Sequence, residues 1–240
     1  MELKPGMRGS ASDASSRPAG RRGRPKKMGP ESVPIIKNAA LQLFATKGYG
    51  NTSLEEVAVR VGFTKGGVYY YFRSKEQLLL EILCDIEARS IAHTAKSMES
   101  SQATPMDKLD MFNVLQAAWA ASNPSDLAVL MLTSLETVRD TGPVSQKVRA
   151  IYAQMEAVLT RAVDDAKAAG QIGREEVTRN IVLSLMAIHD GNILLWYRSG
   201  CDPSAGRMLA AVAKRTVLSS LRRVATNAST SRAAVRGKCS

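Results

Sequence analysis

Apolar side chains recur at helical spacing along the chain from residue 33 onward. The first stripe joins Ile36, Ala40, Leu43 and Phe44 at intervals of three and four residues, which predicts an amphipathic helix. The sequence Gly-Tyr-Gly-Asn at residues 48–51 is expected to stop this helix, because glycine and asparagine tolerate the left-handed backbone found after helix ends.

A much shorter apolar stripe predicts a second helix over residues 54–61. It can be capped in two ways, by a Thr-x-x-Glu box that begins at Thr52 or by a Ser-x-x-Glu box that begins at Ser53. Gly62 is expected to end this helix and to begin a tight turn.

A third short helix is predicted over residues 65–72, with Thr64 as a suitable N-cap. Val68 and Phe72 lie four residues apart and are assigned to the core. The tyrosines at residues 69–71 sweep most of the way round a helix, so they cannot all be buried. Helices this short must pack on their neighbours, and this leaves the outer face of the third helix available for a DNA major groove.

The remaining chain also has helical spacing, and no stretch alternates between apolar and polar residues as a half-buried strand does. A fourth helix is expected from Ser74 to the mid-90s. Further helices are expected over residues 105–121, 125–140, 143–169, 174–199 and 204–225. The predicted fold class is therefore all-α.

Positive charge is concentrated at the two ends of the chain. The 240 residues carry a formal net charge of +11, of which residues 1–30 hold +6 and residues 222–240 hold +5. Residues 31–221 are neutral. Cationic ends on a neutral body indicate contact with a polyanion, most simply nucleic acid, although solubility alone also explains the C-terminal charges.

Composition narrows the class of protein further. Three widely spaced cysteines, at positions 84, 201 and 239, favour neither a disulfide framework nor a zinc site. The N-terminus has no apolar run like that of a signal peptide, and no apolar stretch approaches the length of a membrane span, so a cytoplasmic protein is expected. No cofactor and no metal are predicted.

The residue types around the third helix suit contact with DNA. Lys65 can reach a phosphate or a guanine edge. Gly66 and Gly67 are poor helix formers, and their lack of side chains lets the backbone approach DNA closely. Tyrosine hydroxyls at a partly wet surface can donate to phosphates, and Lys75 adds a cation at a helix N-terminus. A surface aromatic cluster for protein contact is the alternative.

Residues 33–83 resemble the DNA-binding domain of the TetR family of bacterial transcriptional repressors, most specifically in the segment TKGGVYYYFRSKE at residues 64–76. The resemblance implies base contacts from Thr64, Lys65, Gly66 and Gly67, and backbone contacts from Thr52, Ser53, Tyr69, Tyr71 and Lys75. Tyr70 completes the predicted DNA-binding set. Two departures are Val68, where the pattern usually has leucine, and the doubled glycine, which favours recognition of DNA shape over direct base readout.

A basic arm precedes the predicted DNA-binding unit. Residues 20–27 read Gly-Arg-Arg-Gly-Arg-Pro-Lys-Lys, and the Arg-Gly-Arg-Pro core resembles an AT-hook. Arginines that flank a glycine fit a narrow minor groove, so Arg22, Arg24 and Lys26 are predicted to contact DNA there. A generic charged tail is the alternative.

The TetR resemblance implies that the C-terminal part binds a small effector and dimerises through its last two helices, with Gly191 at a close helix crossing. The candidate pocket residues combine aromatic, sulfur-containing and polar side chains: Trp119, Met131, Tyr152, Met155, Met186 and His189. Methionine at helical spacing is more often core than pocket. Because this part has no surplus of Lys or Arg, a mainly apolar or neutral effector is expected.

These observations predict a homodimeric, sequence-specific DNA-binding regulator, a ligand-responsive repressor acting on a near-palindromic operator. The expected division is a disordered arm (1–30), a helix-turn-helix domain (31–75), an effector-binding and dimerisation domain (76–225) and a disordered basic tail (226–240). The alternatives are an activator or an architectural DNA-binding protein without a ligand switch. An enzyme is not expected, because adjacent His189 and Asp190 point about 100° apart on a helix and no nucleophile accompanies them.

Overall fold

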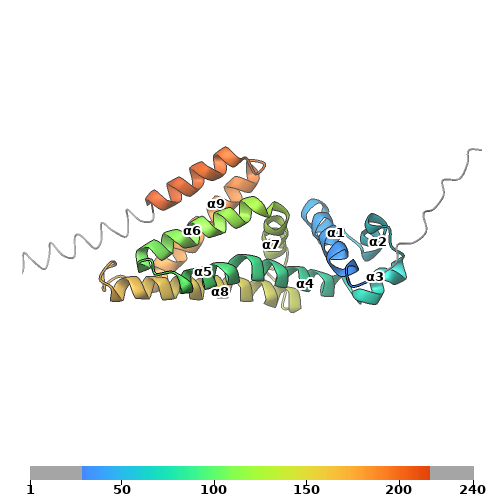
Figure 1. The fold of residues 1–240 in the computed structure, drawn as a ribbon, viewed down its shortest axis with the longest axis horizontal. Helices are drawn as coiled ribbons and strands as arrows, with labels where there is room; N and C mark the ends of the chain where they lie inside the picture. Colours follow the sequence, from blue (N-terminus) through green and yellow to red (C-terminus); the bar gives the residue numbers. More distant parts are fainter. Residues whose placement is uncertain (1–28, 217–240) are drawn as a thin grey trace, which may run out of the picture.

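The computed structural model describes residues 29–216, and every regular element in that part of the chain is helical (Figure 1). The elements are α1 (Ser32–Lys47), α2 (Leu54–Val61), α3 (Lys65–Tyr71), α4 (Lys75–Glu87), a π-helical turn (Ala88–Ala92), α5 (His93–Ser100), α6 (Pro105–Ser122), α7 (Pro124–Glu136), α8 (Pro143–Ala168) and α9 (Thr178–Arg198). Residues 203–216 form a further helix, called the last helix below. The predicted all-α fold is confirmed.

The first three helices form a helix-turn-helix unit at one end of the molecule (Figure 1). Ser53 and Glu56 make the reciprocal capping box that starts α2, so the second of the two predicted boxes is the one formed. Gly62 ends α2 with a φ of +73°, a backbone conformation that favours glycine. Thr64 then caps α3 by accepting a hydrogen bond from the Gly67 N–H at 3.1 Å.

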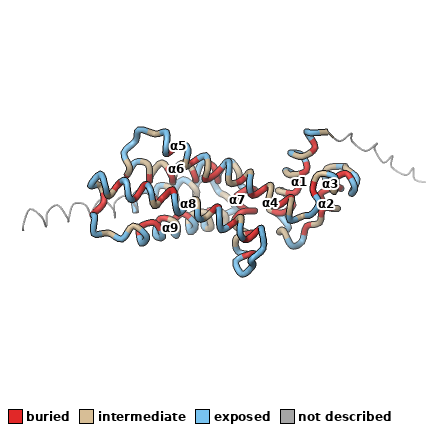
Figure 2. Tube along the Cα trace, turned by 90° about the horizontal axis from the view of Figure 1, so that it is seen from below, coloured by how far each residue is buried: buried red, intermediate tan, exposed pale blue. Residues whose placement is uncertain are grey.

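A continuous apolar core holds these short helices to the rest of the molecule, and Figure 2 shows buried positions along the inner sides of the helices from one end to the other. Val68 is 0% exposed and Phe72 is 1% exposed, which confirms their assignment to the core. Burial of this kind is what stabilises a helix of seven residues, because such a helix is marginal in isolation.

The helix-turn-helix unit is attached to the helical bundle through two elements. α1 packs against both α4 and α7, and α4 follows α3 directly in the chain. Lys37 on α1 forms an ion pair with Asp85 on α4, and the Ser125 hydroxyl on α7 donates to Gln42 Oε1 on α1 at 3.2 Å. These contacts join α1 to both α4 and α7.

Three of the predicted helices differ from the observed ones. The helix predicted from Ser74 to the mid-90s contains the π-helical turn and continues to Ser100. The helix predicted over residues 125–140 ends at Glu136, and the Asp140 carbonyl in the segment that follows accepts hydrogen bonds from two side chains of α8. The helix predicted from residue 174 begins at Thr178, and Lys167 Nζ donates to the Glu176 carbonyl before it at 2.6 Å.

The two basic ends fall outside the part of the chain described by the structure. The predicted contacts of Arg22, Arg24 and Lys26 lie in residues 1–28, and the basic tail lies in residues 217–240. Within residues 29–216, none of the helices combines the length and the apolar character that a bilayer crossing requires.

Candidate functional sites

The N-terminal turn of α3 presents three of the predicted base-contacting residues to solvent. Thr64, Lys65 and Gly66 are all exposed, and the Lys65 side chain is 65% exposed. A Cβ atom placed on Gly66 would meet nothing within 4 Å, so this side of the helix is open. In helix-turn-helix proteins the second helix of the motif, which is α3 here, contacts base edges with its N-terminal residues.

The three consecutive tyrosines have different surroundings, in agreement with the argument that they cannot all be buried. Tyr70 is 74% exposed, whereas Tyr69 and Tyr71 are half-buried. The rings of Tyr70 and Tyr71 meet edge to face with their centroids 5.2 Å apart. The Tyr71 hydroxyl donates to the carbonyl of Gly29 at 2.9 Å, so the chain enters α1 from a point fixed against α3.

Lys65 is neutralised by an acid of the neighbouring helix. Its ammonium lies 2.6 Å from Glu55 Oε1 on α2, and the Tyr69 hydroxyl approaches the same oxygen at 3.4 Å. The hydrogen bond from Lys65 lowers the pKa of Glu55, and the same contact raises the pKa of Lys65. An exposed pair of this kind contributes little stability, so Lys65 can exchange Glu55 for a phosphate or a guanine at small cost.

Glu55 is a partner of Lys65 that the sequence pattern does not single out. The sequence suggests it only as a partner of Thr52 in one of two possible capping boxes. Because Ser53 and Glu56 form the box, the carboxylate of Glu55 is free to face α3. The signal is present in the sequence, since only one of two adjacent glutamates can act as the capping partner.

Lys75 lies where the turn between α1 and α2 meets the start of α4. Its ammonium donates to the carbonyl of Tyr49 at 2.7 Å and to that of Gly50 at 3.3 Å, and it lies 4.3 Å from the centre of the Tyr49 ring. An ammonium group has three hydrogens, so one remains for a phosphate. Ser53 is half-buried and accepts its capping hydrogen bond from the Glu56 N–H.

Two residues of the predicted DNA-binding set are not brought to this surface. Thr52 is 3% exposed, and its hydroxyl donates to the Gly48 carbonyl at 3.0 Å, which closes the turn before α2. Gly67 is buried, and its N–H is bound by Thr64. The two adjacent glycines therefore differ, because Gly66 faces solvent while Gly67 packs inward.

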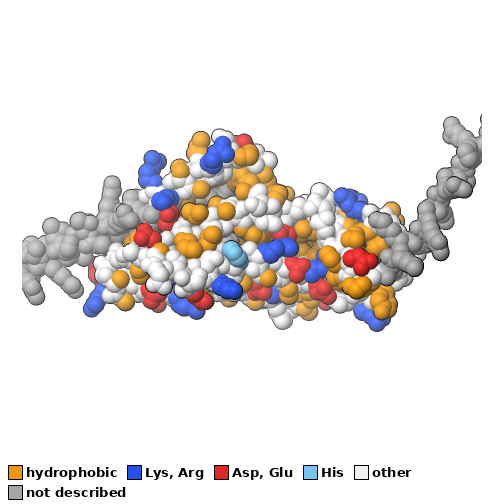
Figure 3. All heavy atoms as spheres, viewed as in Figure 1, with side chains coloured by type: hydrophobic (Ala, Val, Ile, Leu, Met, Phe, Trp, Pro, Cys, Tyr) orange, Lys and Arg blue, Asp and Glu red, His pale blue; other side chains and the backbone are white. Residues whose placement is uncertain are grey.

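Charge on the body of the molecule is mixed. On the face drawn in Figure 3, Lys and Arg side chains are interspersed with Asp and Glu along the described residues. This agrees with the neutral balance of residues 31–221. The described residues therefore form no large cationic patch on this face.

A second candidate site is a cavity of about 140 Å³ inside the bundle, called the central cavity below. It is lined by residues of the π-helical turn, α6, α7, α8 and α9. Five of the six predicted pocket residues line it: Trp119, Met131, Tyr152, Met155 and His189. The sixth, Met186, does not line the cavity and packs half-buried against the core.

Three polar side chains of the central cavity are shaped by burial. The buried indole N–H of Trp119 has no hydrogen-bond acceptor among the described residues. Burial alone lowers the pKa of His189 to about 4, so its ring is neutral near pH 7. Burial and the nearby Asp190 raise the pKa of Tyr152, which keeps its hydroxyl protonated. Such groups favour a ligand that can accept and donate hydrogen bonds.

The π-helical turn connects this cavity to α4. Ser90 and Ile91 of the turn line the cavity, and Arg89 of the same turn forms an ion pair with Asp126 of α7 at 2.9 Å. π-Helical turns often occur at functional sites, where the extra residue redirects side chains. The cavity wall is therefore continuous with the helix that leads to α3.

Metal ligands do not gather anywhere in residues 29–216, where no three His, Cys, Asp or Glu side chains lie close enough to hold an ion. His189 and Asp190 also differ in environment, because His189 is buried and Asp190 is exposed.

Comparison with known proteins identifies the N-terminal helices. Residues 36–82 match the family model described as "Bacterial regulatory proteins, tetR family". The HTH-type transcriptional regulator YuxN of Bacillus subtilis is 49% identical over 53 residues, which are 22% of this chain and 18% of that protein. The first three curated relatives are matched over no more than 34% of their own length.

Similarity at lower identity extends over most of the chain. The HTH-type transcriptional regulator TtgR of Pseudomonas putida is 25% identical over 181 residues, covering 72% of this chain and 83% of that protein. The crystal structure of the MbdR regulator from Azoarcus sp. CIB superposes with a TM-score of 0.70 at 24% identity, covering 78% of this chain and 97% of that one. The fold is thus an N-terminal helix-turn-helix domain followed by a larger helical domain, and residues 36–82 match the DNA-binding part of the TetR family of bacterial regulatory proteins.

Proposed function

We propose that this protein is a homodimeric, sequence-specific DNA-binding transcriptional regulator whose affinity for its operator is set by a small effector. The observation that carries the proposal is the open N-terminal turn of α3, where Lys65 and the side-chain-free Gly66 face solvent within a helix-turn-helix unit. Residues 31–75 are the proposed DNA-binding domain, and residues 76–225 are the proposed effector-binding and dimerisation domain. The regulatory names of the curated relatives support this assignment.

An unpartnered stripe on α9 supports the homodimer. Leu183, Ala187, Gly191 and Leu195 are exposed at intervals of four residues, so they share one face of the helix. A Cβ on Gly191 would meet nothing within 4 Å, so no described neighbour explains the glycine. The last helix adds two exposed apolar side chains, Met208 and Val212. A second copy packed on this stripe would place two α3 helices on successive major grooves of one operator.

The size of the central cavity suggests how an effector would act. A volume of about 140 Å³ is close to that of an engineered cavity that takes benzene. A larger effector must displace the walls, and Ser90 and Ile91 belong to the wall that continues into α4. Because α4 and α7 both contact α1, displacement would change the orientation of α3. The effector alters DNA affinity by as much as its own affinity differs between the two arrangements.

The N-terminal arm is proposed to extend the DNA contact. The Tyr71–Gly29 hydrogen bond fixes the start of the described chain against α3, so the arm begins beside the surface proposed to face DNA. From there Arg22, Arg24 and Lys26 would enter a neighbouring minor groove.

Selection of binding sites from random DNA by the full chain is expected to enrich a near-palindromic sequence, and Gly66→Ala then tests how that site is bound. The substitution should leave the protein folded or stabilise it by up to about 1 kcal/mol, because alanine is the better helix former. It should weaken operator binding at least tenfold, because the new methyl group enters the space between backbone and DNA.

Fluorescence anisotropy and urea unfolding measure the two effects, and Gly142→Ala at an equally open position before α8 is the matched control. Broad binding without an enriched sequence would instead indicate an architectural protein. Full operator affinity in Gly66→Ala would show that the α3 backbone does not approach DNA.

Deletion of residues 1–27 should reduce the salt dependence of operator binding. The slope of log K against log salt is expected to fall in magnitude by about 0.9 for each phosphate that the arm neutralises in the full chain. Tyr71→Phe keeps the arm but removes its anchor, so it should weaken binding a few-fold without changing the slope. An unchanged slope after deletion would mean that the arm touches no phosphates.

Ala187→Trp should convert the dimer to a monomer, because an indole in the proposed interface prevents close approach of the second α9. Sedimentation velocity measures the change, and circular dichroism should show unaltered helix content. Ala157→Trp, at an exposed alanine of α8, is the control and should remain dimeric. A dimeric Ala187→Trp protein contradicts this interface.

Trp119→Phe tests the central cavity. Effectors found by a thermal-shift screen against the full chain should bind the variant about three- to tenfold more weakly, the effect of removing one hydrogen bond. Stability should be retained, since phenylalanine removes an unpartnered buried N–H. Trp196→Phe, which does not line this cavity, should bind the same effectors normally. Equally weakened binding in both variants would place the effector elsewhere.

A further inference from the structure

A larger cavity lies between α6, α9 and the last helix, and its lining does not include most of the residues discussed so far. Its volume is about 320 Å³, within the range of ordinary ligand sites. We call it the last-helix cavity. Much of its wall is alanine, contributed by α6 and the last helix, and it shares only His189 and Ile193 with the central cavity.

Specific contacts hold this cavity in shape. The Trp196 indole N–H donates to the Asp202 carbonyl at 2.9 Å, which fixes the turn into the last helix. A Cβ on Gly206 would lie 3.0 Å from Trp196 Nε1, so the glycine lets the last helix approach α9. Farther along, Lys214 forms an ion pair with Asp110 of α6 at 2.6 Å. The last helix is thus attached at both ends of the cavity while the space between is unfilled.

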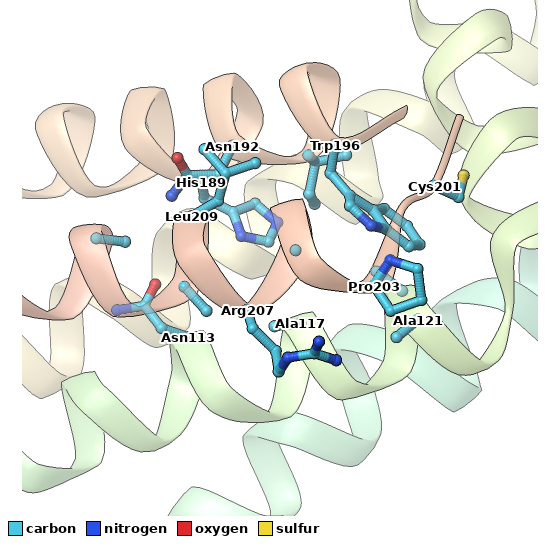
Figure 4. Close-up of a pocket in the computed structure, with 15 residues that line it drawn as sticks. Asn113, Ala117, Ala121, His189, Asn192, Trp196, Cys201, Pro203, Arg207 and Leu209 are labelled. Atoms are coloured by element: carbon cyan, nitrogen blue, oxygen red, sulfur yellow. The ribbon is translucent and has the colours of Figure 1, made fainter. Parts of the chain in front are cut away.

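His189 supplies an unsatisfied polar group to this space. It is 8% exposed, and neither of its ring nitrogens has a hydrogen-bond partner among the described residues. Figure 4 shows His189 and Trp196 reaching from α9 into the cavity. A neutral imidazole offers one N–H donor and one nitrogen acceptor, so the ring can donate a hydrogen bond to a ligand or accept one from it.

The two cavities have opposite charge character. Arg207, an exposed residue, lines the last-helix cavity, no acid lines it within the described residues, and no acid pairs with Arg207 there. The central cavity is lined by Asp190 and by no Lys or Arg of the described chain. A negatively charged ligand is therefore favoured in the last-helix cavity and disfavoured in the central one.

We propose that the last-helix cavity is a separate binding site for a small organic carboxylate with an apolar body. The carboxylate pairs with the Arg207 guanidinium, the alanine-rich walls cover the apolar body, and His189 provides a hydrogen bond inside the cavity. Guanidinium and carboxylate groups match in shape and form paired hydrogen bonds. This site goes beyond the proposed effector site in the central cavity and does not depend on it.

The two tryptophans of the chain allow the cavities to be observed one at a time. Trp196 lines only the last-helix cavity, and Trp119 lines only the central cavity. The Trp119→Phe variant therefore keeps Trp196 as a reporter for the last-helix cavity. The Trp196→Phe variant keeps Trp119 as a reporter for the central cavity. Octanoate and octan-1-ol are suitable probes, since they have the same chain length, differ in charge and do not absorb where tryptophan does.

Octanoate is expected to shift the emission of Trp196 in the Trp119→Phe protein and to bind at least tenfold more tightly than octan-1-ol. Adding Arg207→Gln should remove this preference for the acid, with little effect on the alcohol. Arg215→Gln, an exposed arginine on the same helix that does not line the cavity, should leave the preference intact. Ala117→Phe, which fills the cavity from α6, should abolish binding of both probes.

The proposal is overturned if octanoate produces no saturable change at Trp196, if it changes Trp119 emission instead, or if Arg207→Gln and Arg215→Gln have equal effects. A helix content unchanged by Ala117→Phe shows that its effect is local. These measurements use neither DNA nor effectors of the central cavity. Their failure therefore leaves the proposed regulatory function standing, and failure of the DNA-binding experiments leaves the last-helix site standing.

Discussion

The structure depends on the burial of the inner side of α2 against α1 and of α3 against α2, within the apolar core that α4 shares. Helices of eight and seven residues are too short to be stable alone, so their conformation is maintained by apolar contacts such as those of Val57, Val68 and Phe72. Because the inner side is fully committed to packing, the outer side is available for a ligand as large as a DNA duplex. Two adjacent residues show this division of α3, since Gly66 is exposed on the outer side and Gly67 is buried on the inner side.

The polar contacts around α3 position the residues that are proposed to bind DNA and also restrain them. Lys65 is held by Glu55, Lys75 by two backbone carbonyls, and Tyr71 by the carbonyl of Gly29. Each contact reduces the conformational freedom that a flexible side chain would lose on binding DNA. The exposed Lys65–Glu55 pair is the contact most readily exchanged, whereas the half-buried Lys75 contacts primarily tie three segments of chain together.

The sequence predicts the helices because apolar periodicity and capping residues are local signals. Thr64, Ser74 and Gly62 end or begin helices where their chemistry requires it. The errors lie at helix ends where side chains of another helix bind the backbone, as Lys167 of α8 binds the Glu176 carbonyl before α9. Residues of the site are predictable only where local geometry decides, as for the exposure of Tyr70. Burial of Thr52 depends on a hydrogen bond within a turn. The ion pair of Glu55 with Lys65 depends on how α2 and α3 cross.

Sequence reasoning locates the central cavity but does not separate it from its neighbour. Aromatic and sulfur-containing residues in apolar stripes identify a core, and five of the six predicted side chains share one space because the same stripes face inward on α6, α7, α8 and α9. Alanines give no such signal, because they are common on any helix. The last-helix cavity exists where alanines of α6 face alanines of the last helix, and small side chains on both sides leave room that larger ones would fill. His189 borders both spaces, so a ligand that binds its ring from one side changes which hydrogen bond the ring can offer to the other.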